Sequence, residues 1–198
     1  MSVLAVPDHS QLLLVNPVPR CSRQLDGRLA RRLQAQFHKL SMAADQALVP
    51  RYFAESELEN ERDAWLSTPC EKSKPRVFKF DHDRPVWSNV DLLDAMRQED
   101  REQLFVCGFW LDDVVTAVAL EAQPLGFNTH VIVDLSIAHS RQRRQVCFDR
   151  LNQYGIVLIT LQNLLYEWMA NTEDYLRRHE LEILWQQQDH RDGQGASA

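Results

Sequence analysis

The 198-residue sequence lacks the features that mark several large classes of protein. Its net charge is −6 and its basic residues are scattered, which argues against a nucleic-acid-binding protein with a dedicated basic face. No apolar run approaches the ~20 residues that a membrane-spanning helix needs. The first ten residues, MSVLAVPDHS, have neither a basic region nor a long apolar stretch, so we expect no secretory signal and a cytoplasmic location. Neither a nucleic-acid nor a membrane partner is expected.

Cysteine and histidine are present, but not in the patterns of a metal site. The 4 cysteines lie far apart without a CxxC pair, which excludes a zinc ribbon or finger and argues against a disulfide scaffold. The 7 histidines form neither an HxH nor an HExxH pair. The sequence therefore indicates no metal site, and we expect no cofactor. Cys107, within the apolar run LFVCGFW, is expected to be a buried core residue.

Short apolar runs alternate with amphipathic stretches along the chain. Runs of this kind, bounded by proline, glycine or polar residues, are typical of buried strands. The predicted strands cover residues 11–16, 47–54, 77–79, 103–108, 129–134 and 155–160. Pro50 indicates a bulge or an edge position in the second of these strands.

Helices are predicted between the strands from the helical spacing of apolar residues. Ser88 is the expected N-cap of a helix that carries Val90 to Met96, and the polar stretch before Pro75 is expected to be irregular. The other predicted helices cover residues 26–44, 112–121, 140–153 and 161–186. This alternation is typical of βαβ units, so we predict an α/β fold with a parallel sheet covered on both faces. We expect one domain over residues 1–188 and a disordered tail at 189–198.

In a fold of this type, the functional site lies at the carboxyl ends of the strands. The first half of the sequence has Asn16, Glu55 and Lys79 at these ends, and the second half has residues 108–113 and 134–139. These positions come from distant parts of the chain. We expect them to converge in space.

The residues around these strand ends resemble the isochorismatase-like (cysteine hydrolase) superfamily. GFWLDDVVTAVALEA, residues 108–122, is similar to the segment in which a glycine-ended strand turns into the helix that bears the family's nucleophile. The following run, LGFNTHVIVDLSIAHSRQRRQVCFDRLNQYGIVLITLQNLL, looks closest to isochorismatases of siderophore and phenazine pathways. The resemblance covers roughly residues 10–168. It implies a Rossmann-like, three-layer α/β/α fold with a mostly parallel six-stranded sheet.

The resemblance also implies a catalytic triad of aspartate, lysine and cysteine. At these positions the sequence has Asn16, Lys79 and Val114, so only the lysine persists. Amide hydrolysis in the family needs a thiolate, and the side chain of Val114 has no lone pair with which to attack. Isochorismatases use the aspartate as a proton donor instead, and the carboxamide of Asn16 has no proton to deliver at a useful pKa. Both family mechanisms therefore lack their central residue.

Two acidic residues near these positions are candidates for a relocated acid. Glu55 aligns where isochorismatases often carry a glutamine that touches substrate. Asp113 follows Asp112 at a predicted helix start, where N-terminal capping and the helix dipole also explain acidic residues. The stretch ESELENERDAWL after the second strand contains no histidine, which excludes the zinc-dependent nicotinamidase branch of the family.

Aromatic residues are the remaining candidates for a ligand site. Trp110 aligns with an aromatic residue that lines the pocket of isochorismatases, although core packing explains it equally well. Phe109 and Phe80 are expected beside it. The family has a cis peptide bond that would join Phe109 to Trp110 here.

We interpret the chain as a member of this superfamily that has lost two triad residues. The main hypothesis is a non-catalytic homo-oligomer that binds a small-molecule anion or a pathway enzyme in secondary metabolism. The alternative is a divergent hydrolase or lyase that acts on a small carboxylated cyclic, chorismate-derived substrate with Lys79 and a relocated acid. The apolar residues expected to contribute to self-association are Leu165, Trp168, Tyr175, Leu176, Leu184 and Trp185.

Overall fold

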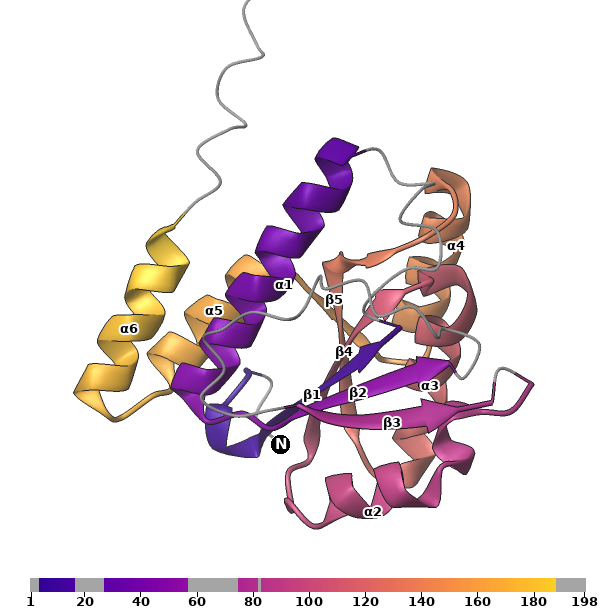
Figure 1. The fold of residues 1–198 in the computed structure, drawn as a ribbon, viewed down its shortest axis with the longest axis horizontal. Coiled ribbons are helices and arrows are strands. Elements are labelled where there is room, and N and C mark those ends of the chain that lie inside the picture. The colour runs from indigo at the N-terminus through magenta and orange to yellow at the C-terminus, as the bar shows by residue number, and fades with distance from the viewer. Residues whose placement is uncertain (1–3, 17–26, 57–74, 82, 188–198) are drawn as a thin grey trace, which may run out of the picture.

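The computed structural model describes residues 4–16, 27–56, 75–81 and 83–187. Within this part of the chain, a six-stranded sheet lies between two layers of helices (Figure 1). The strand order is β3-β2-β1-β4-β5-β6, and every neighbouring pair is parallel. The strands are β1 (Ser10–Val15), β2 (Arg51–Ser56), β3 (Arg76–Phe80), β4 (Gln103–Phe109), β5 (Asn128–Ile137) and β6 (Val157–Ile159). The predicted α/β/α architecture with its parallel sheet is confirmed.

Two separate apolar cores fill the space between the sheet and the helices. One core contains Leu14, Phe37 and Trp168, and the other contains Leu13 and Met96. Neighbouring residues of β1 enter opposite cores because successive side chains of a strand point to opposite faces. The helices of the first core are α1 (Gly27–Ala47), α5 (Leu161–Ala170) and α6 (Tyr175–Gln186); those of the second are α2 (Val90–Arg97), α3 (Thr116–Ala122) and α4 (Arg141–Gln153). β1 is buried throughout because both of its faces are covered.

The start of β2 differs from the prediction. Helix α1 continues to Ala47, and Leu48 then takes a left-handed backbone conformation that ends the helix. The amide of Val49 donates to the carbonyl of Ala44 at 2.9 Å, so the strand begins only at Arg51. Pro50 precedes the strand, and β2 lies inside the sheet between β3 and β1. The predicted bulge or edge at Pro50 is therefore wrong.

Three helix boundaries also differ. Asn89, not Ser88, caps α2, because its side chain accepts a hydrogen bond from the amide of Leu92 at 3.0 Å. The helix predicted at 112–121 begins instead as a π-helical turn, Leu111–Val115, which leads into α3. The single helix predicted over 161–186 is two helices, because Asp174 caps a new one by accepting from two backbone amides.

Some predictions fall outside the described residues. One is the prediction that the polar stretch before Pro75 is irregular, since residues 57–74 are not described. The other is the prediction of a disordered tail at 189–198. Within the described residues, no helix is long and apolar enough to cross a membrane.

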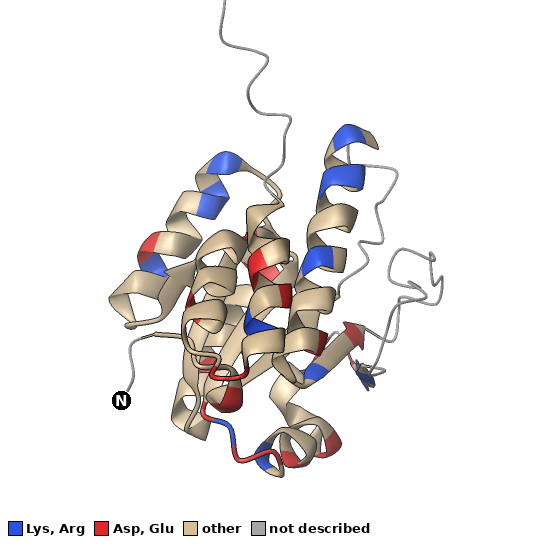
Figure 2. Cartoon of the chain, turned by 90° about the vertical axis from the view of Figure 1, so that its left-hand side faces the viewer, with Lys and Arg blue, Asp and Glu red and all other residues tan. Residues whose placement is uncertain are grey.

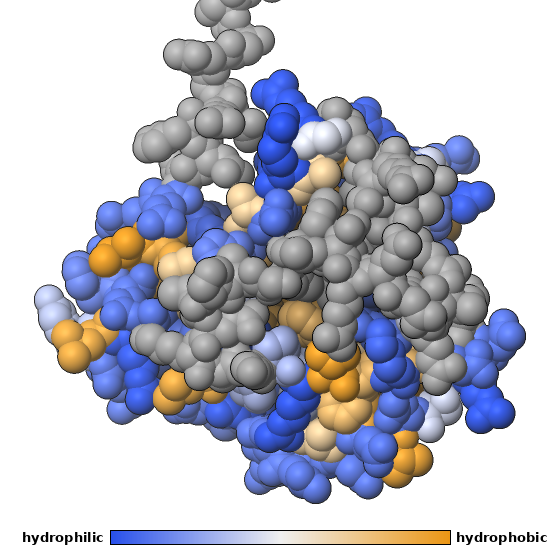
Figure 3. Space-filling view, in the orientation of Figure 1, coloured by the Kyte–Doolittle hydropathy of each residue, from blue (hydrophilic) through white to orange (hydrophobic). Residues whose placement is uncertain are grey.

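Charge and hydropathy are unevenly distributed over the surface. Figure 2 shows basic residues repeated along α1, where Arg28, Arg31, Arg32 and Lys39 contrast with the single acidic residue Asp45. Figure 3 shows apolar patches among hydrophilic side chains on the side of the molecule that carries α6. The exposed large apolar residues of α5 and α6 are Tyr166, Tyr175, Leu176 and Ile183.

Candidate functional site

The sheet register brings several of the predicted site residues to one edge. Val15, the last residue of β1, pairs with Ala54 on one side and with Gly108 on the other. In the next row, Glu55 pairs with Lys79. Asn16 follows Val15 directly, so it lies beside Glu55 at the carboxyl end of the sheet. The predicted convergence of Asn16, Glu55 and Lys79 therefore occurs.

Glu55 and Lys79 form a short ion pair. Lys79 Nζ lies 2.6 Å from Glu55 Oε2, and the two side chains are 40% and 18% exposed. The partner of Lys79 is thus the acidic residue at the end of the neighbouring strand. A charged hydrogen bond of this length fixes the ammonium group of Lys79 beside this carboxylate.

Asn16 is a buried structural residue at the end of β1. Its backbone is in the left-handed region, with φ at 43°, a conformation that asparagine tolerates better than most residues. Its side-chain Oδ1 accepts a hydrogen bond from the backbone amide of Ser56 at 2.9 Å. Its backbone amide donates to the carbonyl of Ala54 at 2.8 Å. These two bonds hold the ends of β1 and β2 together. The side-chain oxygen of Asn16 therefore acts as a hydrogen-bond acceptor for the backbone of β2.

Near the end of β4, residue 108 has a backbone conformation that only glycine can adopt. Gly108 has φ of +135°, and a Cβ atom there would overlap the carbonyl oxygen of Val15. The register between β4 and β5 shifts at this point, between Val106 and Gly108. The peptide bond between Phe109 and Trp110 is cis, as the resemblance predicts.

Val114 lies in the π-helical turn that follows this strand. Its side chain is half-buried and packs against the core on the α2, α3 and α4 side. The carbonyl of Trp110 accepts hydrogen bonds from the backbone amides of Asp113 and Val115, and these two bonds begin the turn. The turn therefore presents an aliphatic side chain at the position that the resemblance assigns to the nucleophile.

The predicted convergence of residues 108–113 with residues 134–139 also occurs, in a polar cluster whose individual contacts the sequence does not indicate. The carboxylate of Asp112 lies 2.9 Å from His139 Nδ1, and it also accepts from the amide of His139 at 3.1 Å and from Arg143 Nη1 at 3.3 Å. The ring of His139 stacks on Trp110, with centroids 4.1 Å apart. Burial raises the pKa of Asp112, but the hydrogen bonds from His139 and Arg143 outweigh it and hold the pKa below its usual range.

This cluster corrects the interpretation of the two acidic residues. No side chain caps the turn at its N-cap, Trp110, and the carboxylate of Asp112 bonds to His139, Arg143 and its own backbone amide. Asp113 is exposed and lines a separate cavity on the α3 and α4 side. No local motif could have revealed the cluster, because Asp112 and His139 are 27 residues apart and meet only through the pairing of β4 with β5.

The remaining aromatic candidates lie in the interior. Phe109 is 1% exposed and packs against Phe37, while Phe80 is 5% exposed and belongs to the other core. Trp110 is half-buried between the first core and His139. Ligand contacts for these three residues stay predictions. Cys107 is buried as expected, and its burial raises the pKa of the thiol, which keeps it protonated and unreactive.

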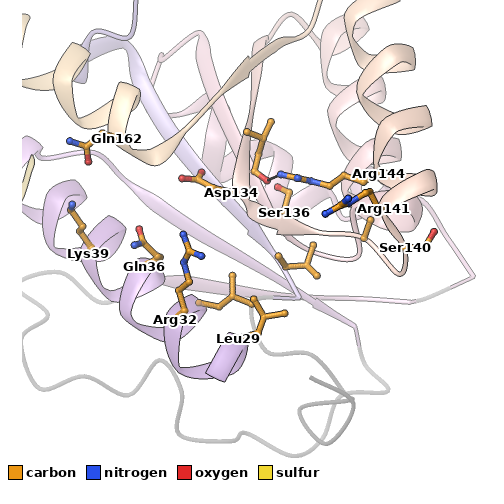
Figure 4. A pocket seen from close by; sticks show the side chains of 14 residues that line it. Leu29, Arg32, Gln36, Lys39, Asp134, Ser136, Ser140, Arg141, Arg144 and Gln162 are labelled. Carbon is orange, nitrogen blue, oxygen red and sulfur yellow. Dashed lines mark hydrogen bonds between the residues drawn. The ribbon is translucent and has the colours of Figure 1, made fainter. Parts of the chain in front are cut away.

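A cavity of about 750 Å³ opens beside this edge, and of the predicted strand-end positions only residues from the 134–139 segment line it: Asp134, Ser136, Ile137 and Ala138. It lies between α1, the carboxyl end of β5 and the beginning of α4 (Figure 4). Asp134, at its centre, accepts hydrogen bonds from the amide of Leu161 at 2.9 and 3.2 Å. Partial desolvation raises the pKa of Asp134, and these bonds act against the shift. Within the described residues, no three histidine, cysteine or acidic side chains are placed to hold a metal ion.

The architecture and site together define a parallel α/β/α protein with its polar residues gathered at the strand ends. A model of the Isochorismatase domain matches residues 30–163, and the chain therefore belongs to that family.

Individual relatives agree with the family assignment. The chain is 32% identical over 75 residues to a probable hydrolase, YcaC, of Escherichia coli strain K12, a match that covers 38% of this chain and only 36% of that relative. The crystal structure of Escherichia coli YcaC, described as an octameric hydrolase of unknown specificity, has a TM-score of 0.75 at 19% identity, over 93% of this chain and 90% of that one.

Two further solved structures have the same fold. A ribonuclease, MAR1, of Caenorhabditis elegans has a TM-score of 0.78 at 15% identity and covers 99% of both chains. An isochorismatase of Pseudomonas putida KT2440 has a TM-score of 0.66 at 16% identity, over 83% of this chain and 94% of that one. At these identities the likeness shows the fold alone.

Proposed function

We propose that this chain is a non-catalytic member of the isochorismatase family that binds a small anionic molecule as a homo-oligomer. The observation that carries the proposal is the hydrogen bond from the amide of Ser56 to Asn16 Oδ1. It gives the residue at the family's aspartate position a backbone role that needs no proton transfer. The aliphatic Val114 adds to this, since it supplies no nucleophile.

The ion pair at Lys79 supports the non-catalytic part of this proposal. In the family pattern a lysine stands beside an acid and a nucleophile, whereas here Glu55 holds the ammonium group at 2.6 Å. A lysine so paired is neutralised by its neighbour, and it attracts an incoming anion less than a free ammonium group does. We expect any ligand at this edge to be held by shape and hydrogen bonds as much as by charge.

Self-association is the second part of the proposal. Tyr175 and Leu176 at the start of α6 are 76% and 72% exposed, and Tyr166 on α5 is 52% exposed. Exposed apolar residues grouped on neighbouring helices favour an interface. The Escherichia coli relative is octameric, and we propose a homo-oligomer for this chain as well. Of the six residues predicted for self-association, Leu165, Trp168 and Leu184 are buried in the core of this chain.

The wider setting follows from the family resemblance. We propose one domain over residues 1–188 and a cytoplasmic location. We also propose a place beside chorismate-derived secondary metabolism, closest to the isochorismatases of siderophore and phenazine pathways, with a pathway enzyme as a candidate partner. Fold alone supports many activities, so these are the least specific parts of the proposal.

A second candidate function is a divergent hydrolase or lyase, and one observation favours it. The 2.6 Å contact places the Glu55 carboxyl beside Lys79, which recreates an acid and lysine couple one strand away from the family's aspartate. In this candidate Glu55 delivers the proton to a small carboxylated cyclic substrate and Lys79 holds its carboxylate. Asp113 is the other relocated acid of this hypothesis, and its exposure makes it the weaker of the two.

The two candidates are separated by measuring pyruvate release from isochorismate. The wild-type protein is compared with Glu55→Gln, which keeps the size of the side chain and removes its proton, and with Asp113→Asn as a matched acid control. The non-catalytic proposal expects no release above the buffer rate from any of the three. Release by the wild-type protein that Glu55→Gln abolishes and Asp113→Asn preserves would establish the second candidate instead.

A further inference from the structure

The cavity between α1, β5 and α4 has a composition that the proposed function does not use. Among the described residues that line it, the basic ones are Arg32 and Lys39 on α1 and Arg141 and Arg144 on α4, against one carboxylate, Asp134. The chain as a whole has a net charge of −6, so this concentration of positive charge is local.

The two helices contribute their cations from opposite sides. Figure 4 shows Arg32 on α1 and Arg144 on α4 extending toward the space that Asp134 occupies. Both arginines lower the pKa of Asp134 through their charge, which places both within electrostatic range of it. Arg144 is also held in place, because its Nη2 donates to the carbonyl of Val133 at 2.9 Å and its guanidinium lies over the ring of Phe148.

The rest of the lining is a mixture of apolar and neutral polar side chains. Leu29 and Leu33 on α1 and Ile137 on β5 supply apolar surface, while Gln36 and Gln162 supply amide groups. A volume of about 750 Å³ suits a small organic molecule, and such sites typically combine apolar walls with a few oriented polar groups. Inorganic phosphate alone would leave the apolar walls without a contact.

We propose that this cavity binds a small organic anion with at least two negative charges and an apolar body. Carboxylate or phosphate groups of the ligand pair with Arg141 and Arg144, whose planar guanidinium groups match such anions. The apolar body lies against Leu33 and Ile137. The site is separate from the edge of Asn16, Glu55 and Lys79, so it does not depend on whether that edge is catalytic.

The test is isothermal titration calorimetry of the full chain with phthalate, which has two carboxylates on an aromatic ring, at low ionic strength. Arg141→Gln is the main variant, because Arg141 is exposed in the first turn of α4 and its loss should leave folding intact. Arg144→Gln is the second. Arg150→Gln is the matched control, since it removes the same charge from the same helix at a residue that lines a different cavity. Lys79→Met reports binding at the strand-end site.

The proposal expects saturable phthalate binding that Arg141→Gln and Arg144→Gln each weaken by at least about fivefold, the scale of a charged hydrogen bond. Arg150→Gln and Lys79→Met should change the affinity by less than about twofold. Inorganic phosphate should bind more weakly than phthalate. The proposal is overturned if no saturable binding occurs, if Arg150→Gln weakens it as much as Arg141→Gln, or if only Lys79→Met does. Equal affinity for phosphate would overturn the assignment of an organic ligand.

Discussion

Replacement of Asn16 tests directly whether this residue has a structural role. In Asn16→Ala, the buried amide of Ser56 loses its acceptor, which costs about 1–3 kcal/mol. Alanine also tolerates the left-handed backbone at φ of 43° less well than asparagine, at a cost of about 1 kcal/mol. We therefore expect Asn16→Ala to lower the free energy of unfolding by about 2–4 kcal/mol. That is a large part of the 5–15 kcal/mol typical of a domain.

A companion variant separates the two contributions. Asn16→Gly loses the same hydrogen bond but adopts the left-handed backbone freely, so it should be less destabilised than Asn16→Ala by about 1 kcal/mol. The free energies of unfolding of both variants are to be measured by urea unfolding followed by tryptophan fluorescence. Measurement at several protein concentrations shows whether self-association contributes to them. An Asn16→Ala protein whose unfolding free energy lies within about 0.5 kcal/mol of wild type would refute the structural role of the side chain.

Three further predictions concern backbone, charge and surface. Gly108→Ala should destabilise the fold by more than about 3 kcal/mol in the same urea assay, because its Cβ would overlap the Val15 carbonyl oxygen. Asp112 has a lowered pKa in the folded state, so its stabilising contribution is present above the unfolded aspartate pKa and is lost as pH falls through the folded one. Asp112→Asn should make the free energy of unfolding depend less on pH below about pH 5, and an unchanged pH profile would contradict this prediction. Leu176→Ser should lower the mass measured by light scattering, whereas Val146→Ser, on the exposed face of α4, should leave it unchanged.

The fold could be predicted from the sequence because its strands are strong local signals. β1 and β4 are nearly continuous apolar runs, which only a strand covered on both faces explains well. The end of β5 was harder to predict. Asp134 looks like a polar strand terminus, yet the strand continues to Ile137 because the paired backbone of β4 extends beside it. Tertiary pairing therefore extends the strand past its local signal.

Helix ends required information that apolar periodicity does not contain. The apolar pattern continues from α5 into α6, and only the side-chain bonds of Asp174 to the amides of Leu176 and Arg177 show where the second helix starts. At α2, Ser88 and Asn89 are both good caps by type, and the choice depends on which oxygen reaches the amide of Leu92. Residue type alone does not decide such geometry.

The candidate site was partly predictable for a similar reason. Asn16, Glu55 and Lys79 were found because each ends a strand, and parallel strands end at one edge. The Asp112 and His139 contact depends on the register between β4 and β5, and the basic cavity depends on how α1 lies against α4. The strand ends predict that residues 108–113 and 134–139 lie close together, but not which of their side chains make contact or that α1 completes a cavity there. Structure was needed to bring these residues together.

Calorimetric titration of the wild-type protein with isochorismate tests the central claim most directly, because it records binding and turnover in one trace. The account predicts a saturable heat of binding after each injection and a return to the starting baseline, since Asn16 and Val114 supply neither proton nor nucleophile. A sustained heat flow proportional to protein concentration, accompanied by pyruvate and lost in Glu55→Gln, would contradict it and identify the protein as an enzyme.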